Sequence, residues 1–249
     1  MSGKTAVDKP FFAGTLRELP PLEKQNAAAL LQEFADSAAG KQPAIADALK
    51  QNRPAALFLS AVLDLSPYLR NVLLRRPSIV GPLFEIPLAQ RLEALILEIE
   101  ASSEAAGITE SALMTALRQL KLEGHVLIAL GDLSGHFATK ETTLWLSRLA
   151  QASVSAAVRF LLRDAHNAGK LALPDLQDPA RDSGWIILAM GKFGAFELNY
   201  SSDIDLIVFI DEHSPAITDA QDCVATFSRL TRRLVRILQA RTADGYVFR

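Results

Sequence analysis

The chain has 249 residues, with 26 Lys and Arg, 28 Asp and Glu, one cysteine and a formal net charge of −2 at pH 7. These values are ordinary for a globular protein with one large or two small domains, and they argue against nucleic acid as the main partner. The single cysteine excludes an internal disulfide and favours a reducing cytoplasm. No signal-peptide core and no stretch of about 18 uninterrupted apolar residues occurs, so we expect no transmembrane helix and no membrane partner.

The N-terminal residues 1–23 contain three prolines and are expected to form an extended arm or loop. From about Asn26 to Asn167 the apolar spacing predicts helices throughout. The expected helices are 26–40, 44–51, 54–66, 67–77, one opening at Pro87, one capped by Thr109 or Ser111, and 141–167.

Three of these helices carry apolar residues at helical spacing, which indicates one buried face each. The three sets are Leu88, Leu92, Leu95, Ile96 and Ile99; Leu113, Leu117, Leu120 and Leu127; and Trp145, Leu149, Ala152, Ala156 and Phe160.

Residues 169–183 contain Pro174, Pro179 and several charged side chains, which is typical of a connection between modules. We therefore expect an arm at 1–23, a helical domain at 24–168, a linker at 169–183 and a second module at 184–249.

The second module contains two short apolar runs separated by a glycine turn. Trp185–Met190 comes first, Gly191, Lys192 and Gly194 follow, and the second run begins with Asp203 and Asp205. Short runs rich in Ile, Leu and Val predict buried strands. Because strand side chains alternate, the two aspartates should lie on the same side, with Cα atoms roughly 6.5–7 Å apart.

This arrangement is suited to phosphate chemistry with a hard cation. Asp203 and Asp205 could share Mg²⁺, which binds carboxylates together with substrate phosphates. Backbone N–H groups of a glycine turn can approach phosphate oxygens closely, and Lys192 adds a positive charge. An Asp-x-Asp or a glycine turn alone is common, so the specific feature is their order and spacing. The Walker pattern and the dinucleotide-binding glycine pattern both fail, because Phe193 follows Lys192 and the glycines are wrongly spaced.

The remaining residues predict one helix and a turn. The helix is expected from Pro215 to about Arg241, with most of its arginines off the apolar face and Cys223 buried. The expected apolar face is Val224, Phe227, Leu230, Leu234 and Ile237 or Leu238. Asp244-Gly245 predicts a turn that leads into a third strand.

Residues 191–209, GKFGAFELNYSSDIDLIVF, resemble the signature of the DNA polymerase β-like nucleotidyltransferase superfamily, although Lys192 replaces a small residue there. They closely resemble the GKLGG-x-ELN-x-SSDIDLIF motif of the bifunctional glutamine synthetase adenylyltransferase/adenylyl-removing family. Residues 116–135 loosely resemble a helical segment of the same family, LRR-x-K-x-x-E-x-x-x-IAL-x-DL. The matching residues are Arg118, Lys121, Ile128, Ala129, Asp132 and Leu133.

The resemblance implies an α+β protein, mainly helical at first and followed by a nucleotidyltransferase module that is incomplete at its C-terminus. The resembled family carries two such modules in tandem, the first adenylyl-removing and the second adenylyl-transferring. The ELN form and the position in the chain are similar to the first. The implied reaction is phosphorolysis of an adenylylated tyrosine of glutamine synthetase, which releases ADP. The resemblance implies that Asp203 and Asp205 are catalytic and hold Mg²⁺. It assigns phosphate and nucleotide binding to Gly191, Lys192, Gly194 and Ser202.

Two further implications concern the extent of the chain and its partners. In the resembled family a third carboxylate comes from a later strand, which would lie beyond Arg249. We therefore expect a fragment that is inactive alone. The implied partners are glutamine synthetase, the PII signalling protein, ATP or ADP, and phosphate, in the cytoplasm. The alternatives are the forward reaction, in which ATP adenylylates the tyrosine, and a non-catalytic docking module.

Overall fold

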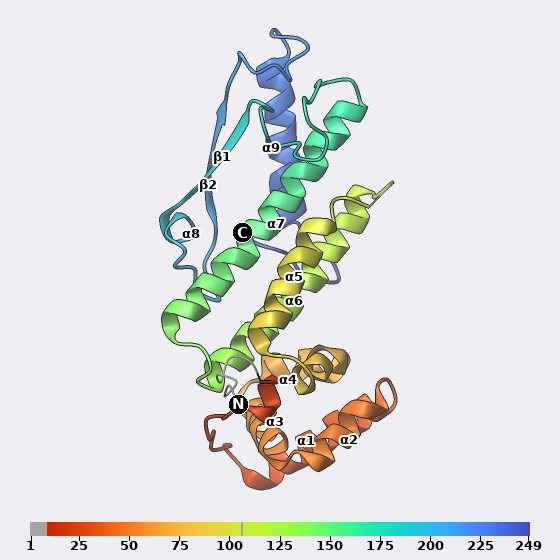
Figure 1. Cartoon of the computed structure of the whole chain (residues 1–249), viewed down its shortest axis with the longest axis vertical. Coiled ribbons are helices and arrows are strands. Elements are labelled where there is room, and N and C mark those ends of the chain that lie inside the picture. The colour runs from red at the N-terminus through yellow and green to blue at the C-terminus, as the bar shows by residue number, and fades with distance from the viewer. Residues whose placement is uncertain (1–8, 106) are drawn as a thin grey trace, which may run out of the picture. The chain divides into compact units, whose positions relative to one another are not determined.

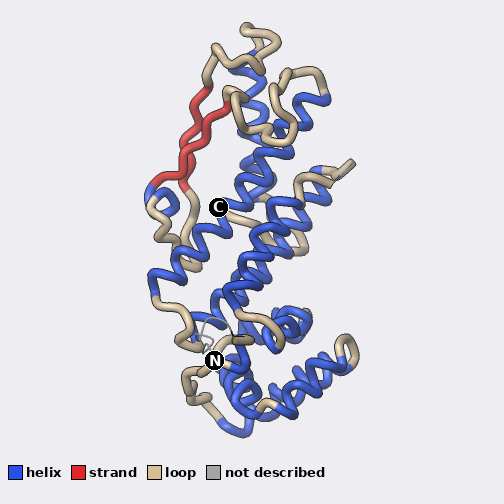
Figure 2. The backbone as a smooth tube through the Cα atoms, in the orientation of Figure 1, coloured by secondary structure: helices blue, strands red, loops and turns tan. Residues whose placement is uncertain are grey.

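The computed structural model describes residues 9–105 and 107–249 and confirms a mainly helical α+β fold (Figures 1 and 2). Contacts divide the chain into two compact units, each formed from two segments. The first unit comprises Met1–Ala94 and Glu123–Thr142, and the second comprises Leu95–Leu122 and Thr143–Arg249. The domain bounds given above stay a prediction, because these units divide the chain at other positions.

The first unit is built from short helices that follow the predicted ones closely. They are η2 (Phe11–Ala13), α1 (Lys24–Ala39), α2 (Pro43–Gln51), α3 (Arg53–Leu65), α4 (Pro67–Arg75) and η3 (Pro77–Phe84). Proline begins several of them, where its missing N–H has no helical partner to lose. The side chains of Asn52 and Ser66 accept hydrogen bonds from the first turns of α3 and α4.

The N-terminal arm is held to this unit where the structure describes it. Phe11 and Phe12 are buried, and the N–H of Phe11 donates to the carbonyl of Ile86. Residues 14–22 form a loop, as expected. The part of the predicted arm at 1–8 lies outside the described residues.

Three further helices follow: α5 (Leu88–Ala101), α6 (Glu110–Leu133) and α7 (Thr139–Asn167). The hydroxyl of Thr109 accepts from the N–H of Ala112, which makes Thr109 the cap of α6. The predicted apolar faces are confirmed, because every residue named for them is buried except Leu120, which is half-buried. Among the described residues no single helix is long and apolar enough to span a membrane. The pair α3 and α4, which is bent by 119° at its junction, meets these criteria only when the two helices are counted together, by length and composition alone.

The second unit contains a two-stranded antiparallel sheet. β1 (Trp185–Met190) is followed by one helical turn, α8 (Gly191–Gly194), and pairs with β2 (Asp205–Ile210). The register joins Trp185 to Ile210 and Met190 to Asp205. α7 and α9 (Cys223–Gln239) lie along one face of the sheet (Figure 1).

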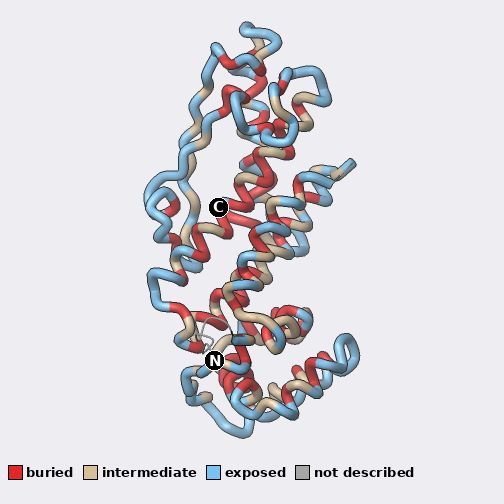
Figure 3. The backbone as a smooth tube through the Cα atoms, viewed as in Figure 1, coloured by how far each residue is buried: buried red, intermediate tan, exposed pale blue. Residues whose placement is uncertain are grey.

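The prediction that both strands are buried is wrong for one face of the sheet. Helices cover only the other face, so alternate residues of β2 and most residues of β1 remain exposed to solvent (Figure 3). The exposed apolar residues on this outer face are Ile186, Leu188, Met190, Ile207 and Phe209.

The helix expected from Pro215 begins eight residues later, at Cys223. Ile217 forms a β-bridge with Leu171, and the N–H of Ala172 donates to the carbonyl of Ala216, which keeps these residues extended. The Asp219 carboxylate then accepts from the N–H of Gln221, which forms a turn before the helix.

The buried face of α9 matches the prediction except at Val224, which is exposed. Cys223 is buried as expected, and burial raises the pKa of its thiol. Three arginines of the helix pair with carboxylates of the same unit. Arg229 pairs with Asp222, Arg233 with Glu110 and Asp164, and Arg236 with Glu110.

The predicted turn at Asp244-Gly245 is confirmed by a bridge between Thr242 and Gly245. The predicted third strand is not formed in the described residues. A single backbone hydrogen bond, from the N–H of Ile204 to the carbonyl of Arg249 at 2.8 Å, joins this segment to the residue just before β2. The segment is also bonded to α9, because the N–H groups of Val247 and Phe248 both donate to the carbonyl of Leu238.

Candidate phosphate and metal site

The two aspartates lie at the start of β2, next to the glycine turn. Asp203 precedes the strand, Asp205 is its first residue, and both are exposed, whereas Ile204 between them is half-buried. This alternation continues along β2 and agrees with two carboxylates on the same side.

The glycine turn brings its backbone against the second aspartate. Gly191 has φ +55°, which favours glycine, and a methyl group added there would lie 3.5 Å from Oδ2 of Asp205. The pairing of Met190 with Asp205 produces this proximity, because Gly191 directly follows Met190. A phosphate group bound at the turn would therefore lie beside the Asp205 carboxylate.

Gly194 has a structural function in this turn. A methyl group added at Gly194 would clash with the carbonyl oxygen of Ala189, because α8 folds directly back onto β1. This close approach is enough to explain the glycine at position 194, so no ligand is needed to account for it.

We expect Gly194→Ala to destabilise the chain by about 2 kcal/mol, since backbone atoms cannot move aside as a flexible side chain can. The matched control is Gly40→Ala. Gly40 has φ −71° and nothing closer than 3.9 Å to an added methyl group, so this change should be neutral or slightly stabilising. Urea denaturation of both variants measures the difference, and equal stabilities would contradict the packing argument.

The other predicted ligands are placed differently. Lys192 is exposed on the turn, where its charge can reach a bound anion. The hydroxyl of Ser202 donates to Oδ1 of Asn199 at 2.9 Å and accepts from the N–H of Asn199. Ser202 thus closes the loop that leads into Asp203, and phosphate binding by Ser202 stays a prediction.

This loop is anchored to α7 by a residue that the sequence reasoning missed. Leu198 is buried, and its N–H donates to the hydroxyl of Ser147, which is itself fully buried. The Ser147 hydroxyl in turn donates to the carbonyl of Thr143 at 2.8 Å. In the sequence Ser147 is only one of several polar residues of a predicted helix. Nothing in the sequence connects it with Leu198.

We expect Ser147→Ala to cost about 1–3 kcal/mol of unfolding free energy, because it leaves the buried N–H of Leu198 without an acceptor. Ser153→Ala is the control. Ser153 is equally buried on α7 and donates to the carbonyl of Leu149, a helical carbonyl that does not depend on it, so the loss should be small. Urea denaturation measures both losses. Similar losses in the two variants would show that the hydrogen bond from Leu198 to Ser147 adds nothing to the free energy of unfolding.

The residues present fit a Mg²⁺ ion that is held partly by its substrate. The described residues contain no cluster of three or more His, Cys, Asp or Glu that could enclose a metal. Mg²⁺ commonly binds through one or two carboxylates, with water and substrate phosphates completing its shell. Two exposed carboxylates beside a glycine turn match that mode of binding.

A second neighbour of the aspartates also escaped the sequence analysis. The guanidinium Nε of Arg249 lies 3.5 Å from Oδ1 of Asp203, in an ion pair open to solvent. A cavity of about 320 Å³ lies between β2 and α9, and its lining includes Asp205, Phe248 and Arg249. The segment that ends at Arg249 therefore lies against the proposed site.

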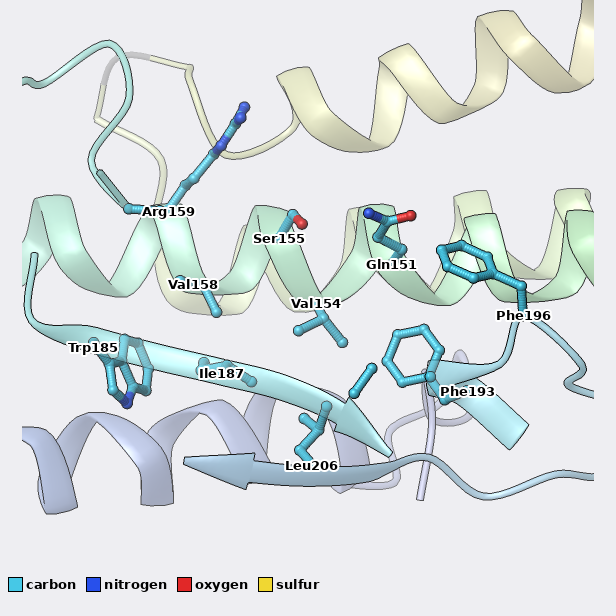
Figure 4. Close-up of a pocket in the computed structure, with 13 residues that line it drawn as sticks. Gln151, Val154, Ser155, Val158, Arg159, Trp185, Ile187, Phe193, Phe196 and Leu206 are labelled. Atoms are coloured by element: carbon cyan, nitrogen blue, oxygen red, sulfur yellow. The ribbon is translucent and has the colours of Figure 1, made fainter. Parts of the chain in front are cut away.

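A larger cavity, of about 450 Å³, lies between α7 and the helix-covered face of the sheet (Figure 4). Val154 and Val158 of α7 face Trp185 and Ile187 of β1 across it, and Phe193 of α8 closes one end. Its lining contains neither aspartate, so we do not assign it to the phosphate site.

Comparison with known proteins identifies the family. A family model described as glutamate-ammonia ligase adenylyltransferase matches residues 57–249. The chain belongs to this family. The glutamate-ammonia ligase adenylyltransferase match includes both aspartates and the helical segment 116–135, and it confirms the resemblance predicted from residues 191–209.

Relatives of the chain carry the name "bifunctional glutamine synthetase adenylyltransferase/adenylyl-removing enzyme". The one from Brucella suis biovar 1 (strain 1330) is 56% identical over 239 residues, which cover 96% of this chain and 24% of that protein. The one from Mesorhizobium japonicum is 53% identical, covering 93% of this chain and 24% of that protein. The one from Xanthobacter autotrophicus is 36% identical, covering 98% and 25%. This member of the glutamate-ammonia ligase adenylyltransferase family therefore spans about a quarter of the length of these relatives.

Proposed function

We propose that this chain carries the adenylyl-removing site of a glutamine synthetase adenylyltransferase/adenylyl-removing enzyme. In the proposed reaction an oxygen of inorganic phosphate attacks the phosphorus of AMP attached to a tyrosine. The bond between that phosphorus and the tyrosine oxygen breaks, ADP is released, and the tyrosine oxygen takes up a proton. The observation that carries the proposal is the Asp205 carboxylate beside the Gly191 turn, with Asp203 two residues earlier.

Each residue has a distinct part in this proposal. Asp203 and Asp205 would hold Mg²⁺, which supplies charge neutralisation at the phosphorus and at the departing oxygen. The backbone of the Gly191 turn and the exposed Lys192 ammonium would bind phosphate oxygens. The loop from Leu198 to Ser202, fixed through Ser147 and Asn199, would keep Asp203 at its place before β2.

The family suggests further partners for the proposed activity. The names of the relatives make glutamine synthetase the proposed protein substrate. The family resemblance alone leads us to propose ATP or ADP and phosphate as small-molecule ligands, the PII protein as a regulator, and the cytoplasm as the location.

The test identifies the nucleotide that is released. Because the relatives are about four times as long, the assay uses a full-length family member that contains this segment, with its other nucleotidyltransferase module inactivated. It is incubated with adenylylated glutamine synthetase, Mg²⁺ and phosphate. We expect ADP whose formation requires phosphate and is lost in Asp203→Asn.

Two results would contradict the proposal. Pyrophosphate formed from ATP and unmodified synthetase, without phosphate-dependent ADP, would assign adenylyl transfer to this site. If a folded protein forms neither product, the segment has no catalytic function of its own.

A further inference from the structure

Arg118 of α6 is a fully buried cation whose partners are backbone carbonyls. Its guanidinium donates to the carbonyls of Ile237 and Ala240 at the C-terminal end of α9, and to Gly245 in the following turn at 3.0 Å. The last carbonyls of a helix lack helical donors and carry partial negative charge, so a cation stabilises them. Arg118 therefore fastens the end of α9 and the turn after it to α6.

Lys121, one helical turn further along α6, extends the same contact. Its ammonium lies 5.3 Å from the centre of the Tyr246 ring and 5.5 Å from that of Phe248, which is the geometry of a cation–π interaction. Burial lowers the pKa of Lys121 to about 8. Within the described part of the chain, neither Lys121 nor Arg118 forms an ion pair with a carboxylate.

The segment held by these two cations, residues 242–249, ends at the proposed site. The carbonyl of Arg249 accepts from the N–H of Ile204, and Ile204 is the residue between the two aspartates. The Arg249 side chain also pairs with Asp203. A shift of this segment would therefore move the backbone that carries both carboxylates.

We propose that Arg118 and Lys121 are positioning residues, which hold segment 242–249 against the start of β2 and so fix the relative placement of Asp203 and Asp205. This inference rests on the proposed function of the two aspartates. It gives a reason for the Arg and Lys of the helical segment 116–135, which lie on α6 and outside the motif that carries the aspartates.

The direct test is amide hydrogen exchange at Ile204 in the 249-residue chain. Lys121→Met keeps the apolar stem and removes the cation, whereas Lys121→Arg keeps a cation. We expect exchange at Ile204 to be about tenfold faster in Lys121→Met, and near the wild-type rate in Lys121→Arg. Arg118→Lys, which loses the forked geometry, should also accelerate it.

The matched control is Arg233→Gln. Arg233 joins α9 to α6 and α7 through Glu110 and Asp164, but none of its contacts involves segment 242–249. Exchange at Ile204 should not change in this variant. Unchanged exchange in Lys121→Met and Arg118→Lys, or equal acceleration in Arg233→Gln, would overturn the proposal.

The second readout is the affinity for Mn²⁺, used as a paramagnetic substitute for Mg²⁺. Lys121→Met should weaken Mn²⁺ binding by about tenfold, and Lys121→Arg should not. Faster exchange at Ile204 with unchanged Mn²⁺ affinity would refute the link to the aspartates. If the wild-type chain binds no Mn²⁺ in the presence of ADP, the proposed function fails, and exchange at Ile204 then decides by itself whether the two cations hold the segment.

Discussion

Asp205→Asn in a full-length family member is expected to lower phosphate-dependent ADP release by more than about a hundredfold. The amide keeps the shape of the side chain but removes the negative charge that would hold the cation beside the Gly191 turn. Asp203→Asn should act in the same direction. Initial rates at saturating adenylylated synthetase and phosphate measure the loss.

The fold should not change in these variants, because both aspartates are exposed and surface substitutions usually alter stability by about 0.5 kcal/mol or less. Asp211→Asn is the matched control, because Asp211 is an exposed aspartate at the other end of β2. It should retain nearly full activity. An Asp205→Asn protein with wild-type rates would remove Asp205 from the site.

Arg118→Met is expected to lower the free energy of unfolding by about 3 kcal/mol, because one buried and one partly buried backbone carbonyl lose their donor. These are the carbonyls of Ile237 and Ala240, which cannot be replaced by apolar groups because they belong to the backbone. Methionine keeps the apolar stem of the side chain, so little of the loss arises from a cavity. Urea denaturation of the 249-residue chain measures this change in the free energy of unfolding.

The same substitution at Arg159 provides the comparison. Arg159 pairs with Glu104 at 3.8 Å, and its side chain is 30% exposed, so Arg159→Met should cost no more than about 1 kcal/mol. If Arg118→Met were as mild as Arg159→Met, the buried guanidinium would not be needed to cap α9.

The sequence was most informative where structure is determined locally. Proline and glycine positions and apolar periodicity were enough for most helix bounds in the first unit and for both strands. The proximity of the glycine turn to Asp205 was also predictable, because a turn that joins paired strands brings their ends together.

The errors arose where distant contacts override local preference. The helix expected at Pro215 begins at Cys223, because a bridge between Leu171 and Ile217 holds the intervening chain extended. Both strands were predicted to be buried, because apolar periodicity does not show that helices cover only one face of the sheet.

The supporting residues of the site were unpredictable for the same reason. Arg118 contacts Gly245, 127 positions away, and Ser147 contacts Leu198, 51 positions away. The helical motif of residues 116–135 could be recognised from sequence, but the use of its Arg and Lys required the fold.

The central claim is that Asp203 and Asp205 form a metal site, and the most direct measurement is a Mn²⁺ titration of the 249-residue chain followed by electron paramagnetic resonance. We predict binding by the wild type and by Asp211→Asn, and its loss in Asp203→Asn and Asp205→Asn. Undiminished binding in a chain that carries both Asn substitutions would contradict the claim, as would a wild-type chain that binds no Mn²⁺ in the presence of ADP.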